Sequence, residues 1–282
     1  MKRIVVIFLT VFTTVFCSCE SSDEELPQIN LDGADLNFSV TQNAQKDNDL
    51  TMTSNDESVI PYWSYTDAGG NELGHSNKAE FSVTMPFAGD YYVNYTAYTK
   101  GGAVEADPVK VTVSANDEEF FSDPEWAILT NGVAGKTWEL DMSSPIGWAG
   151  FDFPRGPEDG DYWNWYPDYA GNEWVMAAKN WGEMTFNLDG GYNVSVTQTA
   201  LNSADQTTST GSFSYNIEEH SINFNGGVEL LYGGDYYPDV SNWTSVEVIE
   251  LSEDSMRLAV IRDQSRSGEG NAKIVFHFKP KG

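Results

Sequence analysis

The stretch Met184–Val196, MTFNLDGGYNVSV, decides the fold class of this chain. Apolar and polar side chains alternate on both sides of the turn sequence Asp189-Gly190-Gly191. A period of two residues places alternate side chains on one face of a strand, and Asp-Gly sequences are typical of tight hairpin turns. The stretch therefore predicts an antiparallel β-hairpin.

Alternating apolar residues continue on both sides of this hairpin. Thr137–Leu140 precedes it, and a second hairpin is expected around Glu218–His220. The remaining strands are expected at further groups of alternating apolar residues: Phe213–Ile217, Ile222–Phe224, Val246–Leu251, Met256–Val260 and Ile274–Phe278. About eight antiparallel strands can stack as two sheets or close as a barrel, and periodicity does not distinguish the two.

Residues 116–282 are therefore expected to form a C-terminal β-domain, a larger antiparallel β-sandwich or jelly roll. Four short motifs carry an alternative: Gly135-Lys-Thr-Trp138, Phe186-x-x-Asp-Gly-x-Tyr192, Gly211-x-Phe-x-Tyr215 and Leu251-x-x-Asp-x-Met-x-Leu258. In this order they resemble lipocalin-like domains of bacterial lipoproteins, which implies a lipocalin-like barrel. Before the first of these strands, a short helix is expected within Phe120–Thr130, with Ser122 or Asp123 as its N-cap and Pro124 as its first residue.

Residues 35–115 show the same alternation in shorter strands. Val109, Val111 and Val113 keep a period of two, and turn residues recur at regular intervals, which predicts a small β-sandwich. The stretch Tyr62–Gly70, followed by a Phe-x-Val strand and Ala-Gly-Asp-Tyr-Tyr-Val, resembles the immunoglobulin-like PKD repeat. The resemblance implies an immunoglobulin-like sandwich that acts as a spacer. Trp63 is expected in its core.

The first residues have the features of an export signal. Lys2 and Arg3 precede the apolar run Ile4–Phe16, and a cysteine follows at Cys19. This pattern predicts a secretory signal peptide, and it resembles specifically a bacterial lipoprotein signal over residues 1–18. The resemblance implies that Cys19 carries the lipid. The acidic tether over residues 19–34 resembles the surface-export signal of Bacteroidota lipoproteins, which implies the cell-surface side of the outer membrane.

Composition excludes several classes of function. The chain has 43 acidic and 15 basic residues, and its net charge of −28 is spread along the sequence. Because phosphate would be repelled, nucleic acid is excluded as a partner. The only cysteines are Cys17 and Cys19, so the domains contain no disulfide, no cysteine nucleophile and no cysteine metal site.

The segment Gly147–Gly182 is the candidate binding region. It contains five of the nine tryptophans, interleaved with acids, glycines and prolines, and fits neither a helical nor a strand period. Aromatic faces pack on the apolar face of a sugar ring, and polar neighbours bind its hydroxyls. The expected stacking residues are Trp148, Trp163, Trp165, Tyr166 and Trp174. Trp181 precedes a strand and is expected in the core. In the alternative interpretation, the rings only cover an open end of the domain.

Motifs for catalysis and metal binding are absent from the sequence. No metal-binding histidine spacing, nucleophile elbow or phosphate-binding glycine loop occurs. A glycoside hydrolase remains the alternative, and it would require two acids facing one tryptophan-lined groove. No cofactor is expected. Calcium is an open option at two groups of acids: Glu158, Asp159, Asp161 and Asp168, or Asp235 and Asp239.

Taken together, the order of lipoprotein signal, PKD-like spacer and tryptophan-rich β-domain resembles surface glycan-binding proteins of polysaccharide utilisation loci. The resemblance implies non-catalytic capture of a polysaccharide, such as the β-glucan laminarin. It also implies a neighbouring outer-membrane glycan transporter complex. The other alternative is a structural or accessory lipoprotein with a lipocalin-like domain.

Overall fold

The computed structural model describes residues 32–282. The predicted signal peptide, the predicted lipidation site Cys19 and most of the predicted acidic tether lie outside the described residues. Within this part antiparallel strands dominate and helices are short, so the expected all-β class is confirmed. None of the helices among the described residues has the length and apolarity that crossing a membrane requires.

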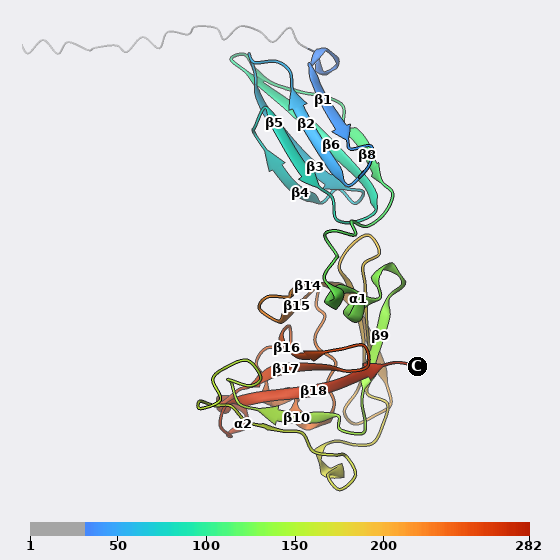
Figure 1. Cartoon of the computed structure of the whole chain (residues 1–282), viewed down its shortest axis with the longest axis vertical. Coiled ribbons are helices and arrows are strands. Elements are labelled where there is room, and N and C mark those ends of the chain that lie inside the picture. Colours follow the sequence, from blue (N-terminus) through green and yellow to red (C-terminus); the bar gives the residue numbers. More distant parts are fainter. Residues whose placement is uncertain (1–31) are drawn as a thin grey trace, which may run out of the picture.

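Residues 38–113 form two antiparallel sheets (Figure 1). The first sheet contains β1 (Phe38–Gln42), β2 (Asp49–Ser54) and β5 (Glu80–Thr84). The second contains β3 (Ile60–Asp67), β4 (Glu72–Ser76), β6 (Gly89–Thr99), β7 (Gly102–Glu105) and β8 (Val109–Val113). Side chains of both sheets share one core, and Trp63 is fully buried in it, as expected. The immunoglobulin-like assignment of these sheets stays a prediction.

Residues 136–280 form a closed antiparallel barrel of eight strands. Each strand from β12 to β18 pairs with the next, and β9 closes the ring by pairing with β12 and β18. The strands are β9 (Lys136–Leu140), β12 (Gly182–Asn187), β13 (Asn193–Thr199), β14 (Gln206–Asn216), β15 (Ser221–Asn225), β16 (Ser245–Leu251), β17 (Met256–Arg262) and β18 (Ala272–Pro280). The barrel alternative therefore holds, and the expected sandwich or jelly roll is wrong. The closing pair of Leu140 with Phe278 joins distant segments, which alternation alone does not specify.

The strand that closes the barrel continues as a ribbon. After β9 and a bulge over residues 141–145, β10 (Ile146–Ala149) pairs again with β18. On its other side β10 pairs with the short strand β11 (Asn164–Trp165). The β10–β11 ribbon therefore extends the barrel wall at one end. It lies beyond the residues through which β9 pairs with β12.

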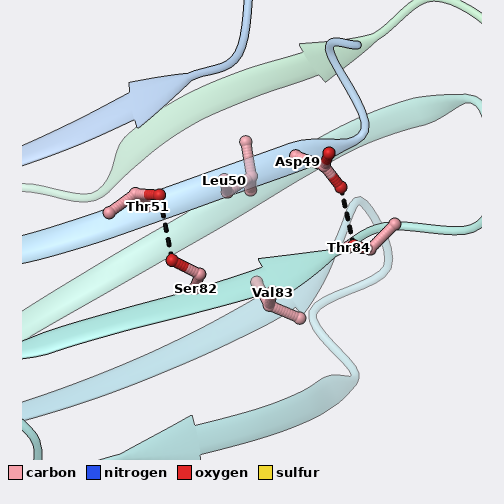
Figure 2. A pocket seen from close by; sticks show the side chains of 6 residues that line it. All are labelled: Asp49, Leu50, Thr51, Ser82, Val83 and Thr84. Atoms are coloured by element: carbon pink, nitrogen blue, oxygen red, sulfur yellow. Dashed lines mark hydrogen bonds between the residues drawn. The ribbon is translucent and has the colours of Figure 1, made fainter.

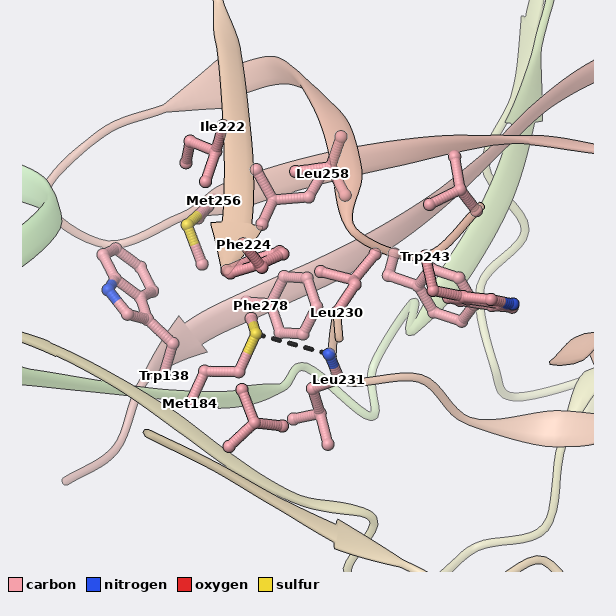
Figure 3. Packing of buried hydrophobic residues seen from close by; sticks show 14 of the residues in the cluster. Trp138, Met184, Ile222, Phe224, Leu230, Leu231, Trp243, Met256, Leu258 and Phe278 are labelled. Atoms are coloured by element: carbon pink, nitrogen blue, oxygen red, sulfur yellow. Dashed lines mark hydrogen bonds between the residues drawn. The ribbon is translucent and has the colours of Figure 1, made fainter. Parts of the chain in front are cut away.

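Side chains fill the interior of the barrel (Figure 3). Residues 226–243, here called the plug segment, connect β15 to β16 and place Leu230 and Leu231 among Met184 and Phe278. The backbone N–H of Leu231 donates to Met184 Sδ at 3.4 Å. The interior space that a lipocalin-like apolar ligand would require is therefore occupied by the protein's own side chains.

Helix α1 (Pro124–Thr130) packs against the barrel as the sequence predicts. Asp123 is its N-cap, and its carboxylate accepts from the N–H of Glu125 at 2.9 Å. Leu129 is buried, and its carbonyl accepts from Nε1 of Trp138 at 3.0 Å. The remaining helical turns are η1 (Gly33–Asp35), η2 (Gly132–Ala134), η3 (Glu173–Val175), η4 (Gly234–Asp239) and α2 (Gln264–Ser267).

The N-terminal sheets contact the barrel at one end. Phe87 packs edge-on against Tyr192 with ring centroids 4.8 Å apart, and Nδ2 of Asn116 donates to the carbonyl of Leu188 at 2.8 Å. In Figure 1, β10 and α2 lie on the side of the barrel away from β1–β8. The β10–β11 ribbon therefore faces away from the N-terminal sheets.

Candidate functional site

The register of the β10–β11 ribbon brings two predicted tryptophans together. Trp148 and Trp165 are directly opposite each other, so both side chains project from the same face. Their rings stack with centroids 5.2 Å apart and planes inclined by 21°. Trp148 belongs to the main barrel core and is 9% exposed, whereas Trp165 is 45% exposed. The buried ring of Trp148 therefore supports the exposed ring of Trp165.

Trp174 extends this row of rings. It lies on η3, and the next two residues, Val175 and Met176, are buried and anchor the turn. Its ring is stacked on that of Trp165, with centroids 6.1 Å apart and planes inclined by 20°. At 67% exposure it is the most accessible tryptophan of the candidate site. It presents an indole face directly to solvent.

Trp163 completes the set of tryptophans from the loop before β11. Its Nε1 donates to Oδ1 of Asp161 at 2.6 Å, and the other carboxylate oxygen of Asp161 accepts from the N–H of Phe151 at 2.9 Å. The ring is 43% exposed. Asp161 thus fixes the orientation of Trp163 and the loop that carries it.

These rings line one groove with a volume of about 360 Å³. This volume is within the range of ligand clefts, about 300–1,000 Å³. The lining residues come from the ribbon and the loop before β11, from η3 and η4, and from the end of β17 and the β17–β18 connection: Trp148, Trp163, Trp165, Trp174, Tyr236, Asp239, Arg262 and Glu269. Five of the eight are aromatic, so the groove offers apolar faces with a polar border.

The polar border is contributed by Asp239, Arg262 and Glu269, which the sequence does not mark as sugar-binding residues, together with the phenol of Tyr236. Arg262 forms an ion pair with Glu269, and its Nε and Nη2 donate to the carbonyl of Gly270 at 2.9 and 2.7 Å. Burial, together with the charges of nearby carboxylates including Asp239, raises the pKa of Tyr236 to about 12. Its phenol therefore stays protonated and can donate a hydrogen bond.

Tyr166 does not join the groove. It directly follows Trp165, the last residue of β11, and because consecutive side chains of an extended chain point to opposite faces, its ring lies on the other side of the ribbon. There it packs edge-on against His277, with centroids 4.8 Å apart, and the Arg257 guanidinium lies 4.6 Å from its ring centroid. A Cβ on Gly147 would overlap the ring of Tyr166, so a glycine is required there. The structure places Tyr166 as support for the ribbon.

The loop between β10 and β11 is held against the outer face of the barrel. Nζ of the buried Lys273 donates to the carbonyl of Phe153 at 2.7 Å and pairs with Glu247 at 2.7 Å. Nη2 of Arg155 donates to the carbonyl of Val248 at 2.6 Å. These bonds fix the loop that presents Trp163.

Trp181, expected in the core, is 3% exposed and belongs to the main barrel core. Its Nε1 donates to the carbonyl of Ala177 at 3.1 Å, and the Lys179 ammonium lies 4.2 Å from its ring centroid. It is not among the groove residues.

A second hollow lies on the N-terminal sheets, between β2 and β5 (Figure 2). Its polar side chains bind one another: Thr51 and Ser82 are 3.0 Å apart, and Thr84 Oγ1 donates to Asp49 at 2.6 Å. Leu50 is fully buried and points into the core. Because the polar groups already have partners and no aromatic ring lines the hollow, the groove on the barrel is the stronger candidate.

Among residues 32–282, no three His, Cys, Asp or Glu side chains are grouped so that they could hold a metal ion, and calcium at the acids named above stays a prediction. Asp161 binds Trp163 and the backbone, and Asp239 lines the groove.

In comparisons with known proteins, no family model and no curated protein matches this chain.

Proposed function

We propose that this protein captures a polysaccharide at the groove of the barrel and does not cleave it. The observation that supports the proposal best is the convergence of four tryptophans and Tyr236 on one open groove with a polar border. Sugar rings bind through stacking of their apolar face on indoles and through hydrogen bonds from their hydroxyls. A neutral β-glucan such as laminarin offers both.

The proposed setting is the cell surface. A lipid on Cys19 would hold the chain in the outer membrane, with the PKD-like sheets as a spacer and a glycan transporter complex as neighbour. Figure 1 supports this setting, because β10, which carries Trp148, and α2, which lies between Arg262 and Glu269 in the chain, are on the side of the barrel away from the N-terminal sheets. A bound glycan would be held on the side directed away from the anchor.

Affinity electrophoresis tests the proposal. The purified protein is run through gels that contain laminarin, mixed-linkage glucan, xylan, mannan or alginate, beside the variants Trp163→Ala/Trp165→Ala and Trp174→Ala. Retardation by a neutral glucan that both variants lose is the expected result. Tyr98→Ala, which removes an exposed ring from the N-terminal sheets, is the matched control and keeps full retardation. Equal retardation of all variants would contradict capture at the groove.

Glycoside hydrolysis is the second candidate, because Asp239 and Glu269 line the groove beside the tryptophans. A catalytic acid needs surroundings that keep its carboxyl group protonated. The side chain of Glu269 is 69% exposed and is paired with Arg262. Both features favour a charged carboxylate, so Glu269 does not have the surroundings of a catalytic acid. Release of new reducing ends from the bound glycan, abolished by Asp239→Asn, would establish hydrolysis and overturn the non-catalytic proposal.

A further inference from the structure

The groove carries a negative charge without a partner. Asp239, Arg262 and Glu269 are its ionisable lining residues apart from Tyr236. Arg262 is engaged by Glu269 and by the carbonyl of Gly270. Asp239 has no side-chain hydrogen bond or ion pair with any residue in the range 32–282. A ligand in the groove therefore meets an unpaired carboxylate and a cation that is already neutralised.

Two aromatic rings of the groove also favour a positively charged ligand group beside Asp239. Trp148 and Tyr236 meet at 73° with centroids 5.6 Å apart, forming a corner of the groove. The faces of such rings attract ammonium groups that lie within about 6 Å of the centroid. An aromatic corner beside a free carboxylate is a suitable environment for a protonated amine.

The bases of the segment Gly147–Gly182 are occupied, and so is Arg266 near the groove, whose Nη1 donates to the carbonyl of Pro238 at 3.2 Å. In Gly147–Gly182 the only bases are Arg155 and Lys179, against the acids Asp152, Glu158, Asp159, Asp161, Asp168 and Glu173. Arg155 binds the carbonyl of Val248, and Nζ of Lys179 binds three backbone carbonyls over residues 200–203. A carboxylate or sulfate on a glycan would find only repulsion from this segment.

We infer that the groove ranks sugar chains by charge: it binds chains that carry cationic amino groups more tightly than neutral chains of the same linkage, and it rejects chains that carry carboxylates. Asp239 sets this order. The inference rests on the proposed function, because it concerns the same groove, and it adds the class of substituent that the groove selects.

Three polymers with one backbone test the ranking: laminarin, laminarin bearing trimethylammonium groups, and carboxymethyl laminarin. Binding is followed by tryptophan fluorescence at about 0.15 M salt, where charges more than about 8 Å apart are largely screened. The cationic polymer is expected to bind roughly three- to tenfold tighter than laminarin, and the carboxymethyl polymer more weakly by a similar factor.

Variants assign the effect to Asp239. Asp239→Asn keeps the shape of the side chain and is expected to remove the preference for the cationic polymer, whereas Asp239→Glu keeps the charge and the order. Glu80→Gln removes the same charge at an exposed position of β5 and is the matched control, with the order unchanged. Thermal melts establish that each variant is folded.

The outcomes separate this inference from the proposed function. If all three polymers bind equally and Trp174→Ala abolishes this binding, the proposal of capture at the groove stands and the ranking by charge is overturned. A ranking that persists in Asp239→Asn would place its origin in the overall charge of the chain and overturn the role of Asp239. Absence of binding to any of the three polymers, or to the neutral glycans named above, would overturn both proposals.

Discussion

Trp148 and Trp165 are directly opposite each other across β10 and β11, with ring centroids 5.2 Å apart. This cross-strand pair brings one buried and one exposed indole to the same face of the ribbon. Trp174 is stacked on the exposed member, so three indoles form a row that begins in the barrel core and ends in solvent. The row therefore links the core of the barrel to the surface of the groove.

Replacing Trp174 by alanine is expected to weaken glycan binding about 5- to 30-fold, because one stacked ring contributes about 1–2 kcal/mol. The free energy of unfolding should change little, since the ring is 67% exposed. Titration calorimetry and urea unfolding measure the two quantities. Unchanged affinity in a folded variant would show that the exposed end of the row does not contact the glycan.

Gly147→Ala should disturb the ribbon from the face on which Tyr166 lies. Its Cβ would lie 2.6 Å from the carbonyl oxygen of Trp165 and would also overlap the Tyr166 ring. We expect a loss of about 1–3 kcal/mol in the free energy of unfolding, together with weaker binding. Gly191→Ala, where a Cβ meets only ordinary contacts, is the control and should have neither effect. Urea unfolding of both variants is the measurement.

Acid should destabilise the protein through His277. Burial and the nearby Arg257 charge lower its pKa to about 4. The unfolded chain binds this proton near pH 6.5, so the free energy of unfolding falls as pH decreases from about 6.5 to about 4. The loss amounts to about 3 kcal/mol, since one pKa unit corresponds to about 1.4 kcal/mol.

Urea unfolding at several pH values measures this loss. The His277→Gln variant should have a flatter dependence in that interval, because it lacks the titrating imidazole. His75→Gln, at an exposed position of β4, should keep the dependence of the unmodified chain. Parallel curves for the chain and its His277→Gln variant would contradict the assignment.

Lys273→Met should loosen the loop that carries Trp163. Lys273 is 3% exposed, and its loss would leave the carbonyl of Phe153 without a partner and Glu247 with Arg155 as its remaining partner. Breaking a fully buried pair costs about 3–5 kcal/mol, and we expect a loss toward the lower end of this range because the Glu247 side chain is 32% exposed. The control Lys110→Met breaks the exposed pair with Asp90, for which we expect less than about 1 kcal/mol. Similar losses for both variants would show that the loop is held by other contacts.

Local features of the fold could be predicted from the sequence because local residues determine them. The Asp189-Gly190-Gly191 turn connects β12 and β13 as predicted, and Asp123 caps α1. Closure of the barrel could not be predicted, since the pairing of Leu140 with Phe278 depends on register between distant strands. A sandwich and a barrel share the same alternation of side chains.

The candidate site was predictable in its tryptophans and not in its polar border. The composition of Gly147–Gly182 indicated Trp148, Trp163, Trp165 and Trp174, all of which line the groove. Tyr166 was expected beside Trp165, and strand alternation places it on the opposite face. Tyr236 lies in the Gly- and Tyr-rich stretch Leu231–Pro238, whose composition suggests an aromatic surface beside that of Gly147–Gly182. Asp239 and Glu269 reach the groove only through the closed topology. No local motif marks them as its neighbours.

The plug segment contributes residues both to the core of the barrel and to the groove. Leu230 and Leu231 seal the interior, and a few residues later Tyr236 and Asp239 line the groove. Ligand occupancy and barrel closure are therefore thermodynamically linked, so a glycan at about 100 times its dissociation constant should raise the free energy of unfolding by about 2.7 kcal/mol. The amide hydrogens of residues 228–243 should exchange more slowly in the complex, which would make hydrogen exchange along this segment a reporter of glycan capture.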